Sequence, residues 1–139
     1  MTARLANAEY ERLLAFRDGL RRFLHWSEEQ AATVGLTAAQ HQLLLAVRGH
    51  PGPDAPAIGD VAAHLLLRHH SAGELVDRAE AAGLLVRQVD PDDRRVVRLA
   101  LTKEGSRRLG ALTALHLEEL TRLGPRLSRL WAGLDEPIS

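Results

Sequence analysis

The stretch IGDVAAHLLLRHHSAGELVDRAEAAGLLVR, from Ile58 to Arg87, decides the fold. Its apolar residues recur at spacings of three and four, which predicts two short helices over residues 58–65 and 69–82. Gly83 stops the second helix, and residues 84–89 (LLVRQV) have the composition of a β-strand. The stretch therefore predicts two helices joined by a short turn and followed at once by a strand.

The next residues predict a hairpin. DPDDRR, residues 90–95, is a charged tight turn, and VVRLAL, residues 96–101, is an alternating strand with Val97, Leu99 and Leu101 on one face. Two short helices followed by a hairpin make a helix-turn-helix with a wing. We therefore expect a mostly α fold with a small β-hairpin wing, which is an α+β class.

Further helices are predicted before this motif. Residues 7–30 contain no proline and carry one apolar stripe, which includes Leu13, Phe16 and Phe23. Thr37 and Gln40 have the spacing of a capping box, which predicts a helix over residues 38–48. HPGPDAP, residues 50–56, holds three prolines and a glycine and predicts a loop.

A long apolar stripe follows Thr102, which can cap a helix. The Gly124-Pro125 pair interrupts the stripe, so we expect either two helices or one kinked helix. The members of the stripe are Leu109, Leu112, His116, Leu120, Leu123, Leu127, Leu130 and Leu134.

Apolar stripes this long at both ends exceed what a short domain core can cover. The terminal helices of two chains are therefore expected to pack together as a two-fold dimer. The expected organisation is one compact unit with dimerisation helices in segments 1–36 and 102–139 and a winged helix-turn-helix domain over residues 37–101.

Composition narrows the function classes. The 18 basic and 18 acidic residues cancel, which argues against a nonspecific polyanion binder. The absence of cysteine excludes disulfides, thiol catalysis and cysteine metal sites. The sequence has no membrane-length apolar run and no signal-peptide pattern at its start, so we expect a cytoplasmic protein with no membrane partner. No phosphate loop or nucleophile motif occurs, so we expect neither an enzyme nor a cofactor.

The chain resembles the MarR family of bacterial winged helix-turn-helix regulators over nearly its whole length. Residues 58–87 look like the helix-turn-helix of that family, and LVDRAEAAGLLVR followed by DPDDRRVVRLALTKEG carries its wing pattern. Asp93 and Arg95 fall on the Asp-x-Arg of the wing tip, and Leu101, Thr102 and Gly105 fall on the Leu-Thr and Gly that follow. The resemblance implies a homodimeric transcriptional repressor that binds a pseudo-palindromic operator in double-stranded DNA.

The resemblance also implies where DNA is contacted. In such proteins the second helix of the motif lies in the major groove, and the wing tip reaches the adjacent minor groove, where Arg95 is the expected insertion. Phosphates repel Asp93, which would hold the wing by pairing with Arg94 or Arg78. The alternative is that DPDDRR is only a solvated turn. The expected DNA-binding residues are Arg68, His69, His70, Ser71, Gly73, Glu74, Arg94 and Arg95.

The second helix of the motif, which we call the reading helix, departs from the family pattern. Family members commonly have a glycine in the turn and a Ser or Thr cap, whereas this chain has Leu66 and Arg68 there, so a sequence preference does not transfer. Glu74 could accept a hydrogen bond from a cytosine amino group or discourage a wrong sequence. Gly73 would serve a close backbone approach or packing against the neighbouring helix.

The seven histidines lack metal-site spacing, so no metal is expected, and His116 is expected to be hydrogen-bonded within its apolar stripe. The resemblance implies a small aromatic or phenolic effector, and Phe23, His25, Trp26 and His41 could line its pocket. For Phe23 and Trp26, core packing is the favoured interpretation.

A second function class fits the same fold. A winged-helix module that binds other proteins, without specific DNA binding, would suit the neutral net charge and Glu74. Specific, salt-sensitive binding to one duplex distinguishes a regulator from such a scaffold.

Overall fold

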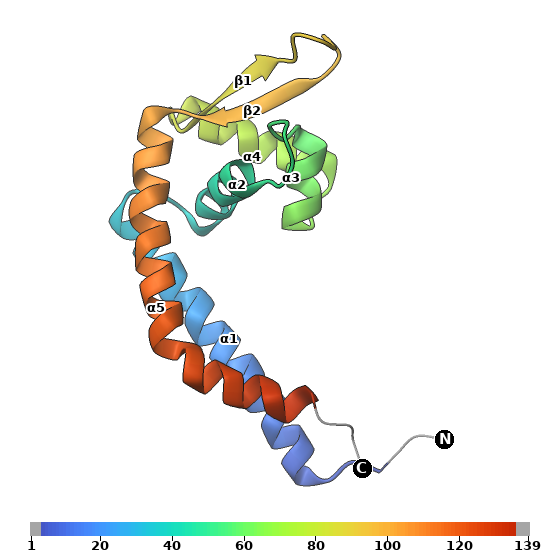
Figure 1. Ribbon diagram of the computed structural model, residues 1–139, viewed down its shortest axis with the longest axis vertical. Helices are drawn as coiled ribbons and strands as arrows, with labels where there is room; N and C mark the ends of the chain where they lie inside the picture. The colour runs from blue at the N-terminus through green and yellow to red at the C-terminus, as the bar shows by residue number, and fades with distance from the viewer. Residues whose placement is uncertain (1–3, 136–139) are drawn as a thin grey trace.

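The computed structural model describes residues 4–135, with only the backbone described at residues 130, 131 and 133–135. A lobe of three helices and a hairpin sits at one end, and two long helices run away from it as a stalk (Figure 1). The predicted mostly α fold with a β-hairpin wing is confirmed. The elements are α1 (Asn7–Thr33), α2 (Ala38–Gly49), α3 (Ile58–Leu65), α4 (His69–Ala81), β1 (Leu85–Val89), β2 (Val97–Leu101) and α5 (Lys103–Asp135).

Two threonines fix the starts of α2 and α5, as the sequence predicts. The Thr37 hydroxyl accepts from the Gln40 backbone N–H, and the Gln40 side chain accepts from the Thr37 N–H, each at 3.1 Å. The Thr102 hydroxyl accepts from the Gly105 N–H at 3.0 Å and donates to the Gly83 carbonyl at 2.7 Å. Thr102 therefore caps α5 and also ties its start to the end of α4.

One hydrophobic core packs α4, the reading helix, against the other elements of the lobe. On α3 and α4, Val61, Ala62, Leu75 and Val76 are buried in this core. Because strands and helices contribute to one core, α4 and the hairpin are held by shared packing. Its largest fully buried side chains are Leu43, Leu44, Leu84, Leu85, Leu99, Leu112, Val61 and Val76.

The turn between α3 and α4 contains an uncommon backbone conformation. Leu66 ends α3 with φ 55°, in the left-handed region, and is the one non-glycine residue with positive φ in the described part of the chain. This conformation costs an L-residue about 1–2 kcal/mol because Cβ crowds the following carbonyl. Gly35 and Gly83 adopt it after α1 and α4, with φ 76° and 77°.

The stalk is built from α1 and α5. The helix α5 continues through Pro125, so the kinked-helix alternative is correct, and Figure 1 shows its ribbon changing direction in the C-terminal part. The predicted stripe positions Leu130 and Leu134 lie outside the described side chains. None of the described helices has the length and apolar character needed to cross a membrane.

Candidate nucleic-acid interface

The helix α4 separates a buried face from an exposed one. Ala72, Leu75, Val76 and Ala79 face the core. The helix begins at His69, after Arg68 at the N-cap, whose side chain makes no capping hydrogen bond. Its N-terminal backbone N–H groups therefore lie beside an exposed set of side chains. The exposed set consists of Arg68, His69, His70, Ser71 and Glu74.

One ion pair lies within this exposed set. The Nε2 atom of His70 lies 3.1 Å from a carboxylate oxygen of Glu74, and both side chains are more than half exposed. The contact holds the His70 ring against the Glu74 carboxylate on the face of α4 that is exposed.

Gly73 lies in open space. A Cβ built on Gly73 would meet nothing within 4 Å, so packing against a neighbouring helix of this chain does not explain the glycine. That alternative is wrong. The close approach of an external backbone stays a prediction.

The wing tip is folded around Asp90. Its carboxylate accepts hydrogen bonds from the backbone N–H groups of Asp92 at 2.7 Å and Asp93 at 3.0 Å. These two bonds and the Arg98 guanidinium lower the pKa of Asp90. The first half of DPDDRR is thus an ordered turn held by its own first residue.

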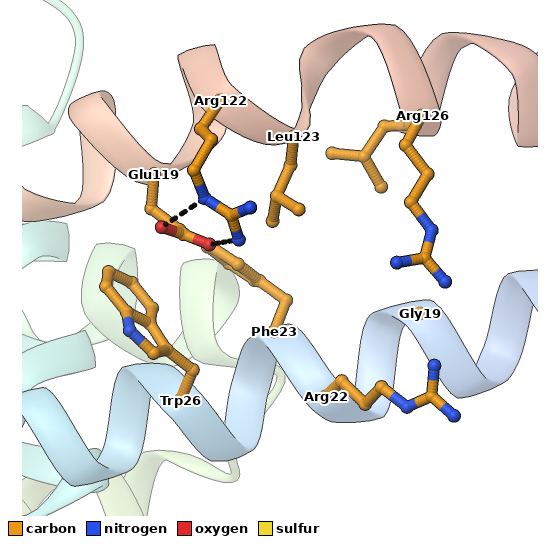
Figure 2. Close-up of a pocket in the computed structure, with 9 residues that line it drawn as sticks. Gly19, Arg22, Phe23, Trp26, Glu119, Arg122, Leu123 and Arg126 are labelled. Carbon is orange, nitrogen blue, oxygen red and sulfur yellow. Dashed lines mark hydrogen bonds and ion pairs between the residues drawn. The ribbon is translucent and has the colours of Figure 1, made fainter.

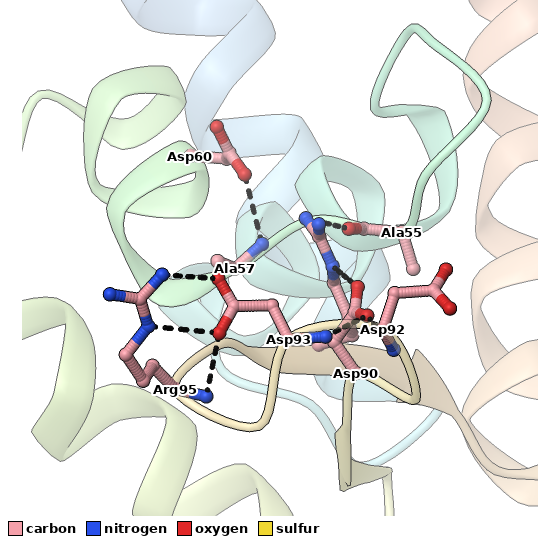
Figure 3. Close-up of polar contacts among 8 residues, drawn as sticks. Ala55, Ala57, Asp60, Asp90, Asp92, Asp93 and Arg95 are labelled. Atoms are coloured by element: carbon pink, nitrogen blue, oxygen red, sulfur yellow. Dashed lines mark hydrogen bonds and ion pairs between the residues drawn. The ribbon is translucent and has the colours of Figure 1, made fainter.

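Asp93 pairs with an arginine, as expected, but the partner is Arg95 and not Arg94 or Arg78. Figure 3 shows the Arg95 guanidinium forked against the Asp93 carboxylate, with Nε–Oδ1 3.0 Å and Nη2–Oδ2 3.1 Å. The Arg95 backbone N–H also donates to Oδ1 at 3.1 Å. This local turn places Arg95 beside Asp93 within the wing tip, whereas Arg78 lies on a different element, α4.

The pairing leaves Arg95 at the surface. Its side chain is 90% exposed although it is hydrogen-bonded twice to Asp93. The hydrogen bond raises the pKa of Arg95 and lowers that of Asp93. Arg94 is exposed as well and forms no ion pair with any residue that the structure describes. The tip therefore presents one oriented guanidinium and one unconstrained guanidinium.

A second arginine joins the wing to the reading helix. Arg87 on β1 donates to Asp77 at 2.5 Å and to Glu80 at 2.7 Å, both on α4. Its side chain is 29% exposed, so the pairs are partly shielded from solvent. The two carboxylates raise the pKa of Arg87, led by the Asp77 hydrogen bond. The angle between wing and helix is therefore set in part by this side chain.

A third arginine anchors the other strand. Arg98 on β2 donates to Asp90 at 3.1 Å and to the Ala55 carbonyl in the loop before α3 at 3.0 Å. The backbone N–H of Leu99 donates to the Pro56 carbonyl at 2.8 Å in the same loop. The loop over residues 50–56 thus supports the wing.

The sequence interpretation did not find the roles of Asp90, Arg87 and Arg98. Each arginine is a polar residue within a predicted strand, where a polar side chain is expected to face solvent. The partners of Arg87 and Arg98 lie outside the strands that hold them, so no spacing within a strand predicts these contacts. For Asp90, the signal was its place at the first position of a turn, where an Asx hydrogen bond is common.

The four expected effector residues divide between two places. Phe23 and Trp26 stack with ring centroids 5.9 Å apart and line a cavity of about 250 Å³ between α1 and α5 (Figure 2). His25 and His41 line a different depression, between α1 and α2. His25 is largely exposed and lies 3.0 Å from Glu29. The structure therefore does not bring all four residues to one pocket.

His116 joins these two groups. Its ring lies 4.9 Å from that of Trp26 and 4.8 Å from that of His41, centroid to centroid. Its ring nitrogens are within hydrogen-bond distance of the Ser27 hydroxyl, at 2.6 Å, and the Leu112 carbonyl, at 2.7 Å, so the predicted hydrogen bonding is confirmed. Burial, with a smaller contribution from His116, lowers the pKa of His41.

Three arginines also line the α1–α5 cavity. Arg122 donates to Glu119, whose pKa it lowers. Figure 2 shows Arg22 and Arg126 extending from the two opposite helices without a dashed contact to another residue drawn. The cavity thus combines an aromatic wall with two unneutralised guanidinium groups. No group of three or more potential metal ligands occurs among the described residues.

Comparisons with known proteins show which family shares this fold. The MarR family model matches residues 34–96. The transcriptional repressor CouR, solved bound to a 23-mer DNA duplex, is 30% identical and covers 95% of this chain and 96% of its own, with a TM-score of 0.70. CouR from Rhodococcus jostii RHA1 bound to p-coumaroyl-CoA is 25% identical, covers 88% of this chain and 86% of its own, and has a TM-score of 0.68.

The MarR family regulator AbsC from Streptomyces coelicolor shares the fold, with 20% identity, 98% coverage of this chain, 86% of its own and a TM-score of 0.72. No curated protein sequence matches the chain. Identity of 30% over nearly the whole of both chains, together with the family match across the helix-turn-helix and the wing tip, establishes the relationship. The chain belongs to the MarR family of transcription regulators.

Proposed function

We propose that this chain is a cytoplasmic repressor that binds a pseudo-palindromic operator as a homodimer and is released by a small aromatic effector. The observation that carries the proposal is that the lobe presents both an exposed face of α4 and an ordered wing tip. Arg87 holds the hairpin against α4 and so helps to set the angle between them. In this interpretation α4 enters the major groove and Arg95, oriented by Asp93, enters the adjacent minor groove. The DNA-bound form of CouR supports the same class of partner.

The exposed leucines of the stalk support a homodimer. Leu14, Leu24 and Leu117 on α1 and α5 are each more than half exposed in the single chain. Several exposed apolar side chains on two packed helices are typical of an interface, and the same surface of a second copy would cover them. Segments 1–36 and 102–139 are thus proposed as the dimerisation helices that flank a DNA-binding domain over residues 37–101. Two copies would then set the spacing of the two reading helices.

The α1–α5 cavity supports an aromatic effector that carries an acidic group. Phe23 and Trp26 supply an aromatic wall, and Arg22 and Arg126 supply guanidinium groups that suit a carboxylate. A ligand here would act by favouring a dimer in which the reading helices are wrongly spaced for successive major grooves. Titration with an aromatic acid such as 4-hydroxycinnamate tests this: release of bound duplex is expected, and Arg126→Ala should weaken it.

The DNA proposal is tested by fluorescence anisotropy on duplexes that tile the DNA upstream of the chain's own gene, at two salt concentrations. Specific binding that weakens as salt rises is expected, and Arg95→Ala should reduce it by about 1–3 kcal/mol. Arg129→Ala, at the exposed far end of α5, is the control for loss of one positive charge: it should sediment as the wild type does and bind DNA equally well. Equal binding to a random duplex would favour the alternative function of a protein-interaction scaffold.

A further inference from the structure

Three helices of this chain end with the same backbone geometry. In each ending, a backbone N–H donates to the carbonyl five residues earlier. Leu36 donates to Ala31 at 2.9 Å after α1, and Leu84 donates to Ala79 at 3.0 Å after α4. After α3, Leu67 donates to Ala62 at 2.9 Å. Such an ending requires a left-handed residue just before the donor.

Only one of the three endings uses a residue that resists this conformation. Gly35 and Gly83 precede the donors after α1 and α4, and Leu66 precedes the donor after α3. Glycine adopts the conformation without steric cost, whereas leucine is strained in it. The chain thus tolerates strain at one helix end that it avoids at two others of matching geometry.

The helix-ending hydrogen bond is the same as at the two glycine endings, and no burial of the Leu66 side chain among the described residues offsets the added strain. Leu66 is 92% exposed, more than any other exposed large hydrophobic residue that the structure describes. It therefore contributes almost no burial to the core, and it also presents apolar surface to water. A residue that costs stability in the folded chain and gains no packing points to a contact outside the chain.

The position of Leu66 indicates which partner. It lies in the turn of the helix-turn-helix, two residues before Arg68 and three before the first residue of α4. When α4 enters a major groove by its N-terminal residues, this turn is carried against the same stretch of duplex. The apolar surfaces that a duplex offers there are the C5-methyl groups of thymine and the deoxyribose carbons.

We propose that Leu66 is a DNA-contacting residue whose side chain packs on hydrocarbon groups of the operator, and that its strained backbone is retained for this contact. The inference rests on the proposed DNA-binding function. It adds one apolar contact residue to the charged and polar residues already proposed to bind DNA. Burial of the leucine on the duplex would recover the apolar surface that the free protein exposes.

The test uses the full-length protein with Leu66→Gly and Leu66→Asn. Both replacements accept the left-handed conformation and remove the apolar side chain. Thermal unfolding should show a melting temperature raised by about 2–5 °C in Leu66→Gly. Affinity for the tightest-binding upstream duplex should nevertheless fall by about three- to tenfold in both variants. A rise in stability together with a loss of binding is an outcome that general damage to the fold does not produce.

Two control variants separate the causes. Gly83→Leu places a leucine in the same conformation at a helix end where a Cβ meets nothing within 4 Å, so it should lower the melting temperature by strain alone. Leu45→Ala removes another leucine of the lobe, 49% exposed in the middle of α2, and should leave DNA affinity unchanged. Sedimentation of Leu66→Gly should show the same oligomeric state as the wild type.

Duplexes with deoxyuridine in place of thymidine distinguish the two hydrocarbon sources. If the C5-methyl is the contact, the substitution should weaken the wild type but not Leu66→Gly. If deoxyribose is the contact, both proteins should tolerate the substitution while the variant still binds less tightly.

Unchanged affinity in Leu66→Gly would overturn the inference while leaving the regulator intact. Loss of the oligomer in Leu66→Gly would overturn it in favour of a contact between copies. Failure of the wild type to bind any duplex specifically would remove the proposed function and the inference together.

Discussion

At the scale of single residues, Gly105 is required by a close approach rather than by its conformation. A Cβ on Gly105 would lie 2.0 Å from the Leu84 carbonyl oxygen, which also accepts a hydrogen bond from the Thr102 N–H at 3.1 Å. The first turn of α5 is therefore pressed against the start of the hairpin. This contact explains why a glycine follows the Leu-Thr pair at this position.

Gly105→Ala is expected to destabilise the protein by about 3 kcal/mol, because either the helix start or the Leu84 peptide must move. Gly110→Ala is the matched control on the same helix, since its Cβ would meet nothing within 4 Å. It should stabilise the helix by up to about 1 kcal/mol. Chemical denaturation of the two variants measures both effects, and equal stabilities would contradict the close approach.

His41 makes stability depend on pH. Because burial lowers the pKa of His41 below 6.5, the unfolded chain binds a proton more readily than the folded chain does. The stability contributed by neutral His41 is fully present above pH 6.5 and is lost as the pH falls below that value. We expect the melting temperature to drop between about pH 7.5 and 5.5, and to drop less in His41→Gln. Identical pH profiles for the two proteins would show that His41 is not the titrating group.

At the scale of elements, the wing and the reading helix are joined by side chains as well as by the core. Arg87 ties β1 to α4, and Arg98 ties β2 to the loop before α3. Ion pairs near the protein surface contribute modest stability, about 1 kcal/mol each, so these partly shielded contacts matter mainly because they fix the geometry of the hairpin. A small change in the angle of the hairpin would displace the wing tip from the minor groove that we propose for it.

Arg87→Gln should therefore weaken operator binding about threefold to tenfold without removing a phosphate contact. Its plot of log affinity against log salt should keep the wild-type slope. Arg94→Ala, by contrast, removes an exposed cation at the tip and should reduce that slope by about one unit if Arg94 binds a phosphate. A reduced slope in Arg87→Gln would mean that Arg87 touches the DNA directly.

At the scale of the whole molecule, the stalk places a large apolar surface far from the wing (Figure 1). A single chain leaves Leu14 58% and Leu117 61% exposed, which is unfavourable for two helices already packed on each other. Association of two stalks would cover this surface and hold the two reading helices at a fixed separation. The same helices also carry the α1–α5 cavity, so a ligand there would act on the helices that we propose as the dimer interface.

The double variant Leu14→Glu, Leu117→Glu is expected to sediment as a monomer, because four buried carboxylates per dimer would oppose association. Its specific DNA binding should fall to the level of a half-site, at least tenfold weaker. Leu45→Glu, on an exposed position of α2 in the lobe, is the matched control and should stay dimeric. A dimer that survives the double substitution would place the interface elsewhere.

The sequence by itself determined the elements and the turn chemistry. The bounds of α3, the capping box of Thr37 and the cap of Thr102 could all be predicted, because periodicity and capping depend on residues within one or two helical turns. The wing tip could be placed for the same reason. Its internal pairing was assigned to the wrong arginine because an Asx turn, rather than charge alone, brings Arg95 onto Asp93.

Only the tertiary structure decided what meets across elements. It separated Phe23 and Trp26 from His25, brought His116 between Trp26 and His41, and joined Arg87 to α4. It also placed Leu66 in a conformation that its residue type disfavours. These features depend on how helices pack at long separation in the chain, and no local pattern of side chains encodes that packing.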